Sequence, residues 1–376
     1  MDFTFTEEQE LMRESVKKFA AKDYDFETRR KIVDTDAGFS RDMLTKFAEL
    51  GWTSVPFSEE DGGFGGSAVD TMIVLEELAK GLVVEPYLSC IVFPGALLKR
   101  GNKALRAAHL PQLIETTKLY AVAYAEQDAR FDVYHQQTRA EKDGDGFRLY
   151  GDKVAVLGGA SADYLIVAAR TSGAVGDARG ITLFVVPSED KGVQRLDHRT
   201  VDGLRMADVR FEGVSVPADA VVGEIDGGGP VLERAVDEAT IALGAEAMGV
   251  MEVLYKTTVT YTKERVQFGH PISKFQTLQF RMADMYVAYE EAKSMVYMAS
   301  MSVDSDQDVA KAASAMKVCV GKAGTRVGEE AIQLHGGMGM TEELAVSHFF
   351  KRMTMIGLQF GDVSHHLKRY QACCQD

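Results

Sequence analysis

The hydrophobic pattern of this chain changes its period twice, and no other feature restricts the possible folds as much. Up to about residue 118, apolar residues follow a helical spacing, interrupted by turn-rich stretches such as the glycine-rich segment 58–70. Between about 119 and 225 the apolar runs are short, β-branched and aromatic. After three glycines at 227–229 the helical spacing returns and holds to the end. We therefore expect a helical domain over 1–118, a β domain over 119–225 and a helical domain over 226–376.

The middle part of the chain predicts a mostly antiparallel β domain. Its short runs are separated by Gly, Asp and Ser and contain no helical stretch between them. The expected strands are 121–125, 147–151, 163–169, 181–187 and 208–217. Strands at this spacing favour a sandwich or barrel and argue against a parallel nucleotide-binding sheet.

The last third of the chain predicts long amphipathic helices. Apolar residues step by three and four over 232–254, 278–299 and 309–334, and two glycines follow the third run at 336–337. Such helices, joined by short loops, form a bundle whose apolar stripes must be buried against each other or against another chain. The methionines on these stripes indicate packing rather than a cofactor site.

Charge and composition exclude several classes of function. Lys and Arg number 42 and Asp and Glu number 56, which gives a net charge of −14. An acidic chain repels phosphate backbones, so we expect no nucleic-acid partner. No run approaches the roughly 18 apolar residues of a membrane span, and the acidic start has no signal-peptide core, so we expect a cytoplasmic protein without membrane contact. Four cysteines give no disulfide framework, and adjacent His365 and His366 face different ways on a helix, so we expect no metal site.

Local motifs make the order of the three domains specific. The chain resembles the acyl-CoA dehydrogenase family over essentially its whole length. The similar segments are FTEEQELMRESVKKFA (5–20), GDKVAVLGGASADYLIVAAR (151–170), YTKERVQFGHPISKFQTLQFRMADM (261–285) and QLHGGMGMTEE (333–343). The resemblance implies an α+β protein with an N-terminal helical domain, a middle antiparallel β domain and a C-terminal four-helix bundle. It also implies an FAD-dependent oxidoreductase that desaturates a CoA thioester between its α and β carbons.

The resemblance assigns a set of bundle residues to FAD. They are Arg265, Phe268, Gln276, Gln333, Leu334, Gly336 and Gly337. A guanidinium suits a pyrophosphate, amide side chains can bond to adenine or ribose hydroxyls, and bare glycine amides can face phosphates. The ordinary alternatives are a solvated helix surface for the long side chains and a helix C-cap for the glycines. In the family these residues reach the flavin of a neighbouring subunit, which implies a dimer or a dimer of dimers.

The β-domain half of the expected flavin pocket departs from the family. The family's approximate Thr-Glu-Pro-x-x-Gly-Ser-Asp segment, which surrounds the isoalloxazine ring, reads here as AEQDARFD at 125–132. Arg130 and Phe131 stand where close backbone approach is wanted. The family's Trp-Ile-Thr stretch is Ala-Val-Leu at 155–157. This half of the pocket therefore looks degenerate.

The base that removes the proton α to the thioester is also missing from both places where the family carries it. Phe360 aligns with one such glutamate and Ala239 with the other, and Thr240 aligns with an arginine that lies near CoA. Glu238 is one residue away from the second place and points about 100° around the helix. Glu246 is the remaining candidate on that helix face, although it lies roughly 10 Å along the axis.

A chain with the bundle half of a flavin site and without a base resembles the small subunit of the family's two-subunit members. These include pimeloyl-CoA dehydrogenases and enzymes that act on CoA esters of steroid fragments. The resemblance implies an α2β2 complex in which a larger acyl-CoA dehydrogenase subunit holds the base, an acyl-CoA is the substrate and an electron-transfer flavoprotein accepts the electrons. The alternatives are a self-sufficient homotetramer with Glu246 as base, a flavin-free scaffold subunit, and an oxygen-using oxidase.

Overall fold

The computed structural model describes residues 5–375 of the chain, which form two compact units. The first unit contains the N-terminal residues up to Lys31, the segment Ala68–Val83 and everything from Thr240 onward. The second unit contains Ile32–Ser67 and Val84–Ala239. Helix α7 (Gly228–Glu264) runs from one unit into the other.

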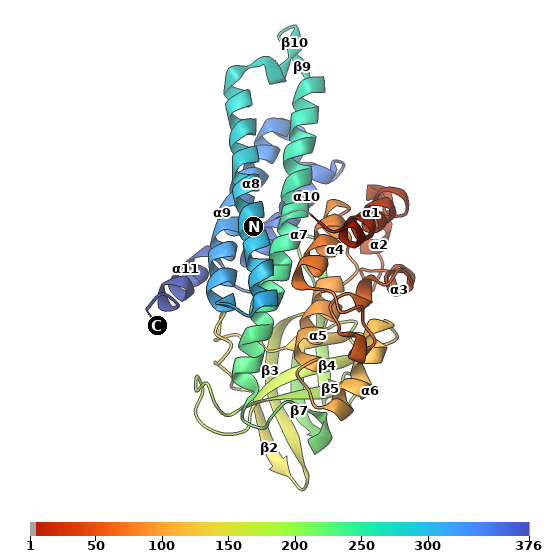
Figure 1. Ribbon diagram of the computed structural model, residues 1–376, viewed down its shortest axis with the longest axis vertical. Coiled ribbons are helices and arrows are strands. Elements are labelled where there is room, and N and C mark those ends of the chain that lie inside the picture. Colours follow the sequence, from red (N-terminus) through yellow and green to blue (C-terminus); the bar gives the residue numbers. More distant parts are fainter. Residues whose placement is uncertain (1–4, 376) are drawn as a thin grey trace. The chain divides into compact units, whose positions relative to one another are not determined.

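The expected order of helical, β and helical parts is confirmed. The N-terminal helices are α1 (Glu7–Lys22), α2 (Phe26–Val33), α3 (Arg41–Glu49), α4 (Ala68–Lys80), α5 (Phe93–Leu98) and α6 (Lys103–Ile114). The C-terminal helices are α7, α8 (Gln276–Ser305), α9 (Val309–His335), α10 (Ala345–Leu358) and α11 (Val363–Ala372). A short hairpin of β9 (Val266–Gln267) and β10 (His270–Pro271) joins α7 to α8 (Figure 1). The three long helical patterns of the sequence are therefore α7, α8 and α9.

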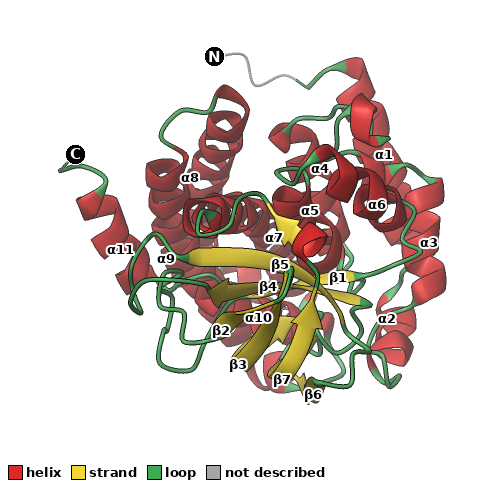
Figure 2. Cartoon of the chain, turned by 90° about the horizontal axis from the view of Figure 1, so that it is seen from below, coloured by secondary structure: helices red, strands yellow, loops and turns green. Residues whose placement is uncertain are grey.

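The middle part forms one mixed sheet within the described residues. Its strands are β1 (Tyr120–Ala123), β2 (Arg139–Asp143), β3 (Gly146–Leu157), β4 (Tyr164–Arg170), β5 (Ile181–Pro187), β6 (Val193–Arg199), β7 (Arg205–Val216) and β8 (Val221–Val222). The order is β6-β7-β3-β2-β4-β5-β8, with β1 beside β4. Strands β1 to β7 can be followed in Figure 2. Most pairs are antiparallel, as expected, but β1 and β2 both pair with β4 in parallel.

Two strands lie where the sequence shows no apolar run. In β2 only Ala140 is buried, and in β6 no residue is buried. The residues of β6 are mostly charged or polar, and the strand lies at an edge of the sheet, paired only with β7. Charged edge strands protect a sheet from pairing with other chains, and they lack the period-two pattern by which strands are found.

The second unit has an apolar core on one face of the sheet. It includes Leu149 from β3, Val167 from β4 and Phe211 from β7, all fully or almost fully buried. In the helical part of the same unit, the hydroxyl of Tyr87 donates to the carbonyl oxygen of Trp52 at 2.8 Å, and both residues are buried. The polar end of this buried ring is thus satisfied, as a stable interior requires.

The first unit is built around α9. This helix packs along α8, and both α10 and α11 pack on it. Glycines allow the close approach: a Cβ atom on Gly324 would lie 2.2 Å from the Met353 side chain, and one on Gly244 would lie 2.5 Å from that of Met316. A methyl group at either position would force the flexible methionine side chain to move, so these glycines let the methionines of the neighbouring helices pack directly against the backbone.

Candidate active site

The α7–α8 connection carries three of the residues assigned to FAD. Arg265 directly follows α7, its N–H donates to the Tyr261 carbonyl at 2.8 Å, and its own carbonyl accepts from the N–H of Ile272 at the same distance. Phe268 has a left-handed backbone with a φ of 55° and is 86% exposed. Gln276 begins α8 and is exposed, as is the side chain of Arg265. The hairpin therefore presents a cation, a ring and an amide to its surroundings.

The end of α9 carries the other four residues. Gly336 caps the helix with a φ of 60°, and a Cβ atom added to Gly336 or Gly337 would have no neighbour within 4 Å. Gln333 is exposed, while Leu334 is only 6% exposed. The glycine amides and Gln333 are thus open to a ligand. The Leu334 side chain belongs to the interior, and the structure gives it no polar role.

The two groups lie at the same end of the first unit. The ring of Tyr261, in the last turn of α7, stacks on that of His335, the last residue of α9, with centroids 4.3 Å apart. The Tyr261 hydroxyl also donates to the His335 carbonyl at 3.4 Å. This contact brings the segment of Arg265 beside that of Gly336. An exposed guanidinium near bare amides fits the phosphates and hydroxyls of a dinucleotide such as FAD.

In the second unit, the changed segment 125–132 is firmly held at its base. Glu126 accepts from the N–H groups of Gln137 and Thr138 at 2.6 and 2.9 Å and from the ammonium of Lys153 at 2.7 Å. The Lys153 side chain is completely buried and also donates to the Gln136 side chain. Burial lowers the pKa of Lys153 to about 8 against the opposing effect of Glu126. The pKa of Glu126 lies below its usual value because its partners outweigh its burial.

The stretch 155–157 also keeps a defined shape without the aromatic and hydroxyl groups of the family. Ala155 is exposed, has a φ of 53°, and donates its N–H to the Asp208 carboxylate at 2.9 Å. The pairing of β3 with β7 shifts register between Lys153 and Val156. A bulge of this kind redirects side chains, but an alanine offers the redirected position only a methyl group.

The first expected position of the base is occupied by a buried ring on a clamped turn. Phe360 is 7% exposed and has a φ of 60°. At the same turn, the buried ammonium of Lys317 donates to the carbonyls of Ile356 at 2.8 Å and Gly361 at 2.7 Å. Burial lowers the pKa of Lys317 to about 7. The turn between α10 and α11 is therefore fixed, and at residue 360 it offers no group that could accept a proton.

The second expected position of the base is also apolar. Ala239 and Thr240 are both fully buried on α7. Glu246, seven residues further along α7, accepts from Nε of Arg352 at 2.5 Å and from Nη2 at 2.8 Å. Both carboxylate oxygens of Glu246 are thus bound by one guanidinium from α10. This arrangement makes the partly buried Glu246 an ion-pair residue that ties α7 to α10.

Glu238 is engaged in a cluster that the sequence did not reveal. Its carboxylate accepts from Arg100 at 2.5 Å and from Arg234 at 2.9 Å, and Lys99 lies 3.4 Å away. Burial raises its pKa, but these three cations outweigh burial and hold the pKa at about 2. In the sequence, the adjacent cations Lys99 and Arg100 were the one feature that could have indicated this cluster. Only the fold shows that Arg100 contacts Glu238, 138 positions further along the chain.

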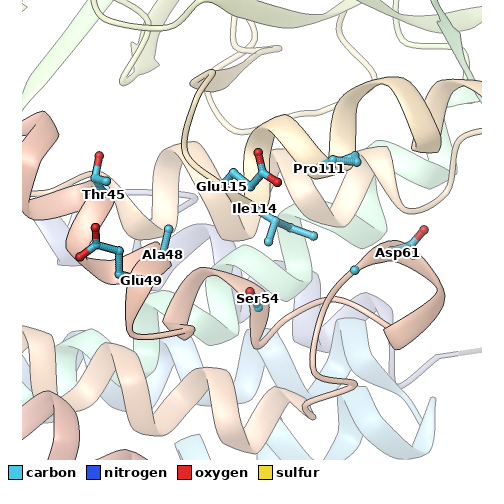
Figure 3. A pocket seen from close by; sticks show the side chains of 9 residues that line it. Thr45, Ala48, Glu49, Ser54, Asp61, Pro111, Ile114 and Glu115 are labelled. Carbon is cyan, nitrogen blue, oxygen red and sulfur yellow. The ribbon is translucent and has the colours of Figure 1, made fainter.

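A recess of about 420 Å³ lies between α3 and α6 in the second unit (Figure 3). Glu49, Asp61 and Glu115 are among the residues that line it. Asp61 is paired with Arg106 at 2.7 Å, but the carboxylates of Glu49 and Glu115 would repel the phosphates of CoA or FAD, and none of the residues assigned to the cofactor lies there. This recess is therefore a poor candidate for the active site.

Residues 5–375 contain neither a metal cluster nor a membrane-spanning helix. No group of three or more His, Cys, Asp or Glu in this range is arranged to hold a metal ion. None of the helices in the same range has the length and apolar character to cross a membrane.

Comparisons with known proteins cover the whole length of the chain. Models of the N-terminal, middle and C-terminal domains of acyl-CoA dehydrogenase match residues 6–117, 121–214 and 226–362. A probable acyl-CoA dehydrogenase of Bacillus subtilis is 30% identical over 98% of both chains. A short-chain-specific acyl-CoA dehydrogenase of Clostridium acetobutylicum is 29% identical over 93% of both.

Solved structures share the complete fold. Butyryl-CoA dehydrogenase from Megasphaera elsdenii superimposes with a TM-score of 0.92 at 28% identity, covering 100% of each chain. A structure of PigA with FAD and proline has a TM-score of 0.91 at 25% identity and covers 100% of this chain and 99% of that one. With three domain models in order and a relative at 30% identity over nearly all of both chains, this chain belongs to the acyl-CoA dehydrogenase family of oxidoreductases.

Proposed function

We propose that this chain is the small subunit of a two-subunit, FAD-dependent acyl-CoA dehydrogenase, and that its larger partner carries the catalytic base. One observation supports this most strongly: no free carboxylate stands at either family position. Phe360 and Ala239 are buried and apolar, and the remaining candidate, Glu246, is bound through both oxygens by Arg352. A base must be free to take a proton in the reacting complex.

FAD supplies the acceptor for the β-hydrogen when it is bound. In our proposal this chain holds the cofactor through Arg265, the amides of Gly336 and Gly337, and the side chains of Gln276 and Gln333. The open surroundings of both glycines and the exposure of Arg265 support this role. The partner subunit's carboxylate takes the α-proton of the acyl-CoA, and an electron-transfer flavoprotein receives the electrons.

For the substrate we propose a dicarboxylyl-CoA, such as pimeloyl-CoA, or a steroid-derived acyl-CoA. The support is the resemblance of the ending FKRMTMIGLQFGD, at 350–362, to the small subunits of pimeloyl-CoA dehydrogenases.

We also propose a cytoplasmic location. It is supported by the four cysteines, all of which are free thiols in the structure.

A self-sufficient homotetramer is the second candidate, because the loop over 125–138 is better preserved than its sequence indicates. Lys153 and Glu126 brace its base. Arg130 keeps a left-handed backbone, with a φ of 51°, at the position of a family glycine. The relatives that share the fold include a butyryl-CoA dehydrogenase. A loop that keeps this shape could still receive a flavin ring in the same chain.

Flavin stoichiometry separates the two candidates. The chain is expressed alone and together with the acyl-CoA dehydrogenase subunit encoded next to it, and bound FAD per chain is measured by absorbance after size-exclusion chromatography. Our proposal expects a colourless or poorly soluble chain alone, and an α2β2 complex with one FAD per unlike pair. A stable yellow homotetramer with one FAD per chain would reject the small-subunit role and support the second candidate.

A further inference from the structure

Arg130 adopts a backbone conformation that arginine rarely takes. Its φ is 51°, in the left-handed region, and it lies in a turn closed by the N–H of Asp132, which donates to the Ala129 carbonyl at 3.0 Å. Glycine is the usual residue there, because a Cβ atom in this conformation crowds the following carbonyl oxygen. Strained backbone positions cluster at ligand-binding sites, so a long charged side chain at such a position is a candidate for a binding role.

The guanidinium of Arg130 has no partner within residues 5–375. It is exposed, and no hydrogen bond or ion pair joins it to Asp128 or Asp132, although each lies only two positions away in the chain. Arginine carries five N–H donors in a planar fork and is charged at every physiological pH. Here the fork and its charge are left for a group outside the described residues.

The loop below Arg130 is held rigidly at both ends. At one end Glu126 joins the buried Lys153, and the Ala125 carbonyl accepts from the N–H of Val154 at 2.9 Å. At the other end the Arg170 guanidinium donates to the carbonyls of Tyr134 at 2.9 Å and Gln136 at 3.2 Å. Because its base is fixed, the loop holds the backbone of Arg130 in a defined place, so less backbone entropy is lost when the side chain binds a ligand.

We propose that Arg130 binds a phosphate group of an adenosine diphosphate moiety, the group that FAD and coenzyme A have in common. The proposal rests on the proposed function, which brings these two phosphate-bearing ligands to the chain. A guanidinium matches two phosphate oxygens at once. The chain has a net charge of −14, so an unpaired cation on a rigid loop is the kind of feature that lets an acidic protein hold an anion.

Two substitutions in the co-expressed complex separate the charge from the strain. Arg130→Ala removes the guanidinium and keeps the left-handed residue, whereas Arg130→Gly removes both. We expect each to weaken binding of one phosphate ligand at least about tenfold, as for a lost charge-assisted contact. We also expect the glycine variant to melt about 1–3 °C above the alanine variant, because it no longer carries the strain. Arg139→Ala, on the exposed face of β2, is the matched control.

Binding is measured separately for each ligand. FAD is titrated into flavin-stripped complex by fluorescence, and CoA and 3′-dephospho-CoA are titrated by calorimetry. A loss confined to FAD assigns the arginine to the cofactor, and a loss confined to CoA assigns it to the substrate; either result supports the proposal. Unchanged affinity for both ligands would overturn it, as would a complex that dissociates while its nucleotide affinities stay the same. If the glycine variant were no more stable than the alanine variant, the left-handed backbone at residue 130 would not be strained, which would contradict the first step of the proposal. The flavin content of the wild-type complex tests the proposed function independently.

Discussion

The cofactor-facing end of the bundle and the braced loop of the β domain use their charges in opposite ways. At the end of α7 and α9, Arg265 and Gln333 are exposed and the amides of Gly336 lie in open space. At the base of the β-domain loop, Lys153 and Glu126 are buried and bound to each other. The exposed groups of the bundle remain available to bind a ligand. The buried pair of the β domain instead fixes the shape of the loop backbone. Substitutions in the two regions should therefore affect different measurements.

The largest effect is expected for Lys153→Met, which leaves the buried Glu126 without its ionic partner. Removing one member of a buried pair costs about 3–5 kcal/mol, so we expect a loss of that size in the free energy of unfolding. Urea denaturation of the purified chain or complex measures it. The double variant Lys153→Met with Glu126→Gln should recover part of the loss. Equal stability of the wild type and the single variant would show that the buried pair does not stabilise the loop.

The next effect is a pH dependence centred on Glu238. Its pKa is about 2 in the folded chain against 4.5 as the ordinary value, so the stabilisation is complete above about pH 4.5 and disappears as the pH falls toward 2. The difference corresponds to about 3 kcal/mol. We expect Glu238→Gln to remove this part of the acid sensitivity, measured as unfolding free energy from about pH 6 to about pH 2.5. A variant with the same pH profile as the wild type would show that the three cations do not hold the carboxylate.

Arg265→Ala tests the exposed region. Loss of a charge-assisted contact to a cofactor phosphate costs about 1.5–3 kcal/mol, a roughly ten- to hundredfold weaker retention of FAD. Because the side chain is exposed, unfolding should be unaffected. FAD release on dilution is followed by fluorescence, with Lys274→Ala, an exposed cation close by, as control. Unchanged FAD retention in the intact complex would reject the role of Arg265.

The smallest effect on catalysis is expected for Glu246→Gln. In our proposal Glu246 is an ion-pair residue and the partner subunit carries the base, so flavin reduction should stay within a few-fold of wild type. A catalytic base contributes roughly a hundred- to ten-thousand-fold. Stopped-flow reduction by a saturated acyl-CoA measures this step without product release. A loss above a hundredfold with FAD still bound would place the base in this chain.

Much of the architecture could be predicted from local patterns. The runs of α7, α8 and α9 repeat every three to four residues over many turns, and β5 (Ile181–Pro187) has the bounds expected from its apolar run. Strands β2 and β6 were missed because most of their residues are charged or polar and exposed. They therefore lack the alternation of apolar and polar residues by which strands are recognised. The parallel pairing of β1 with β4 was also missed, since strand order depends on contacts between distant segments.

The sequence by itself determined the family, the helical and β segments, and the absence of a carboxylate at residues 239 and 360. These depend on residue type and spacing, which can be read along the chain. Only the tertiary structure decided how the remaining charges are used. Glu246 meets Arg352 from 106 positions away, and Lys153 meets Glu126 across 27. Whether a charge is buried and paired or exposed and available depends on which distant residues the fold brings within hydrogen-bond reach. The first kind of charge stabilises the backbone, and the second kind can bind a ligand.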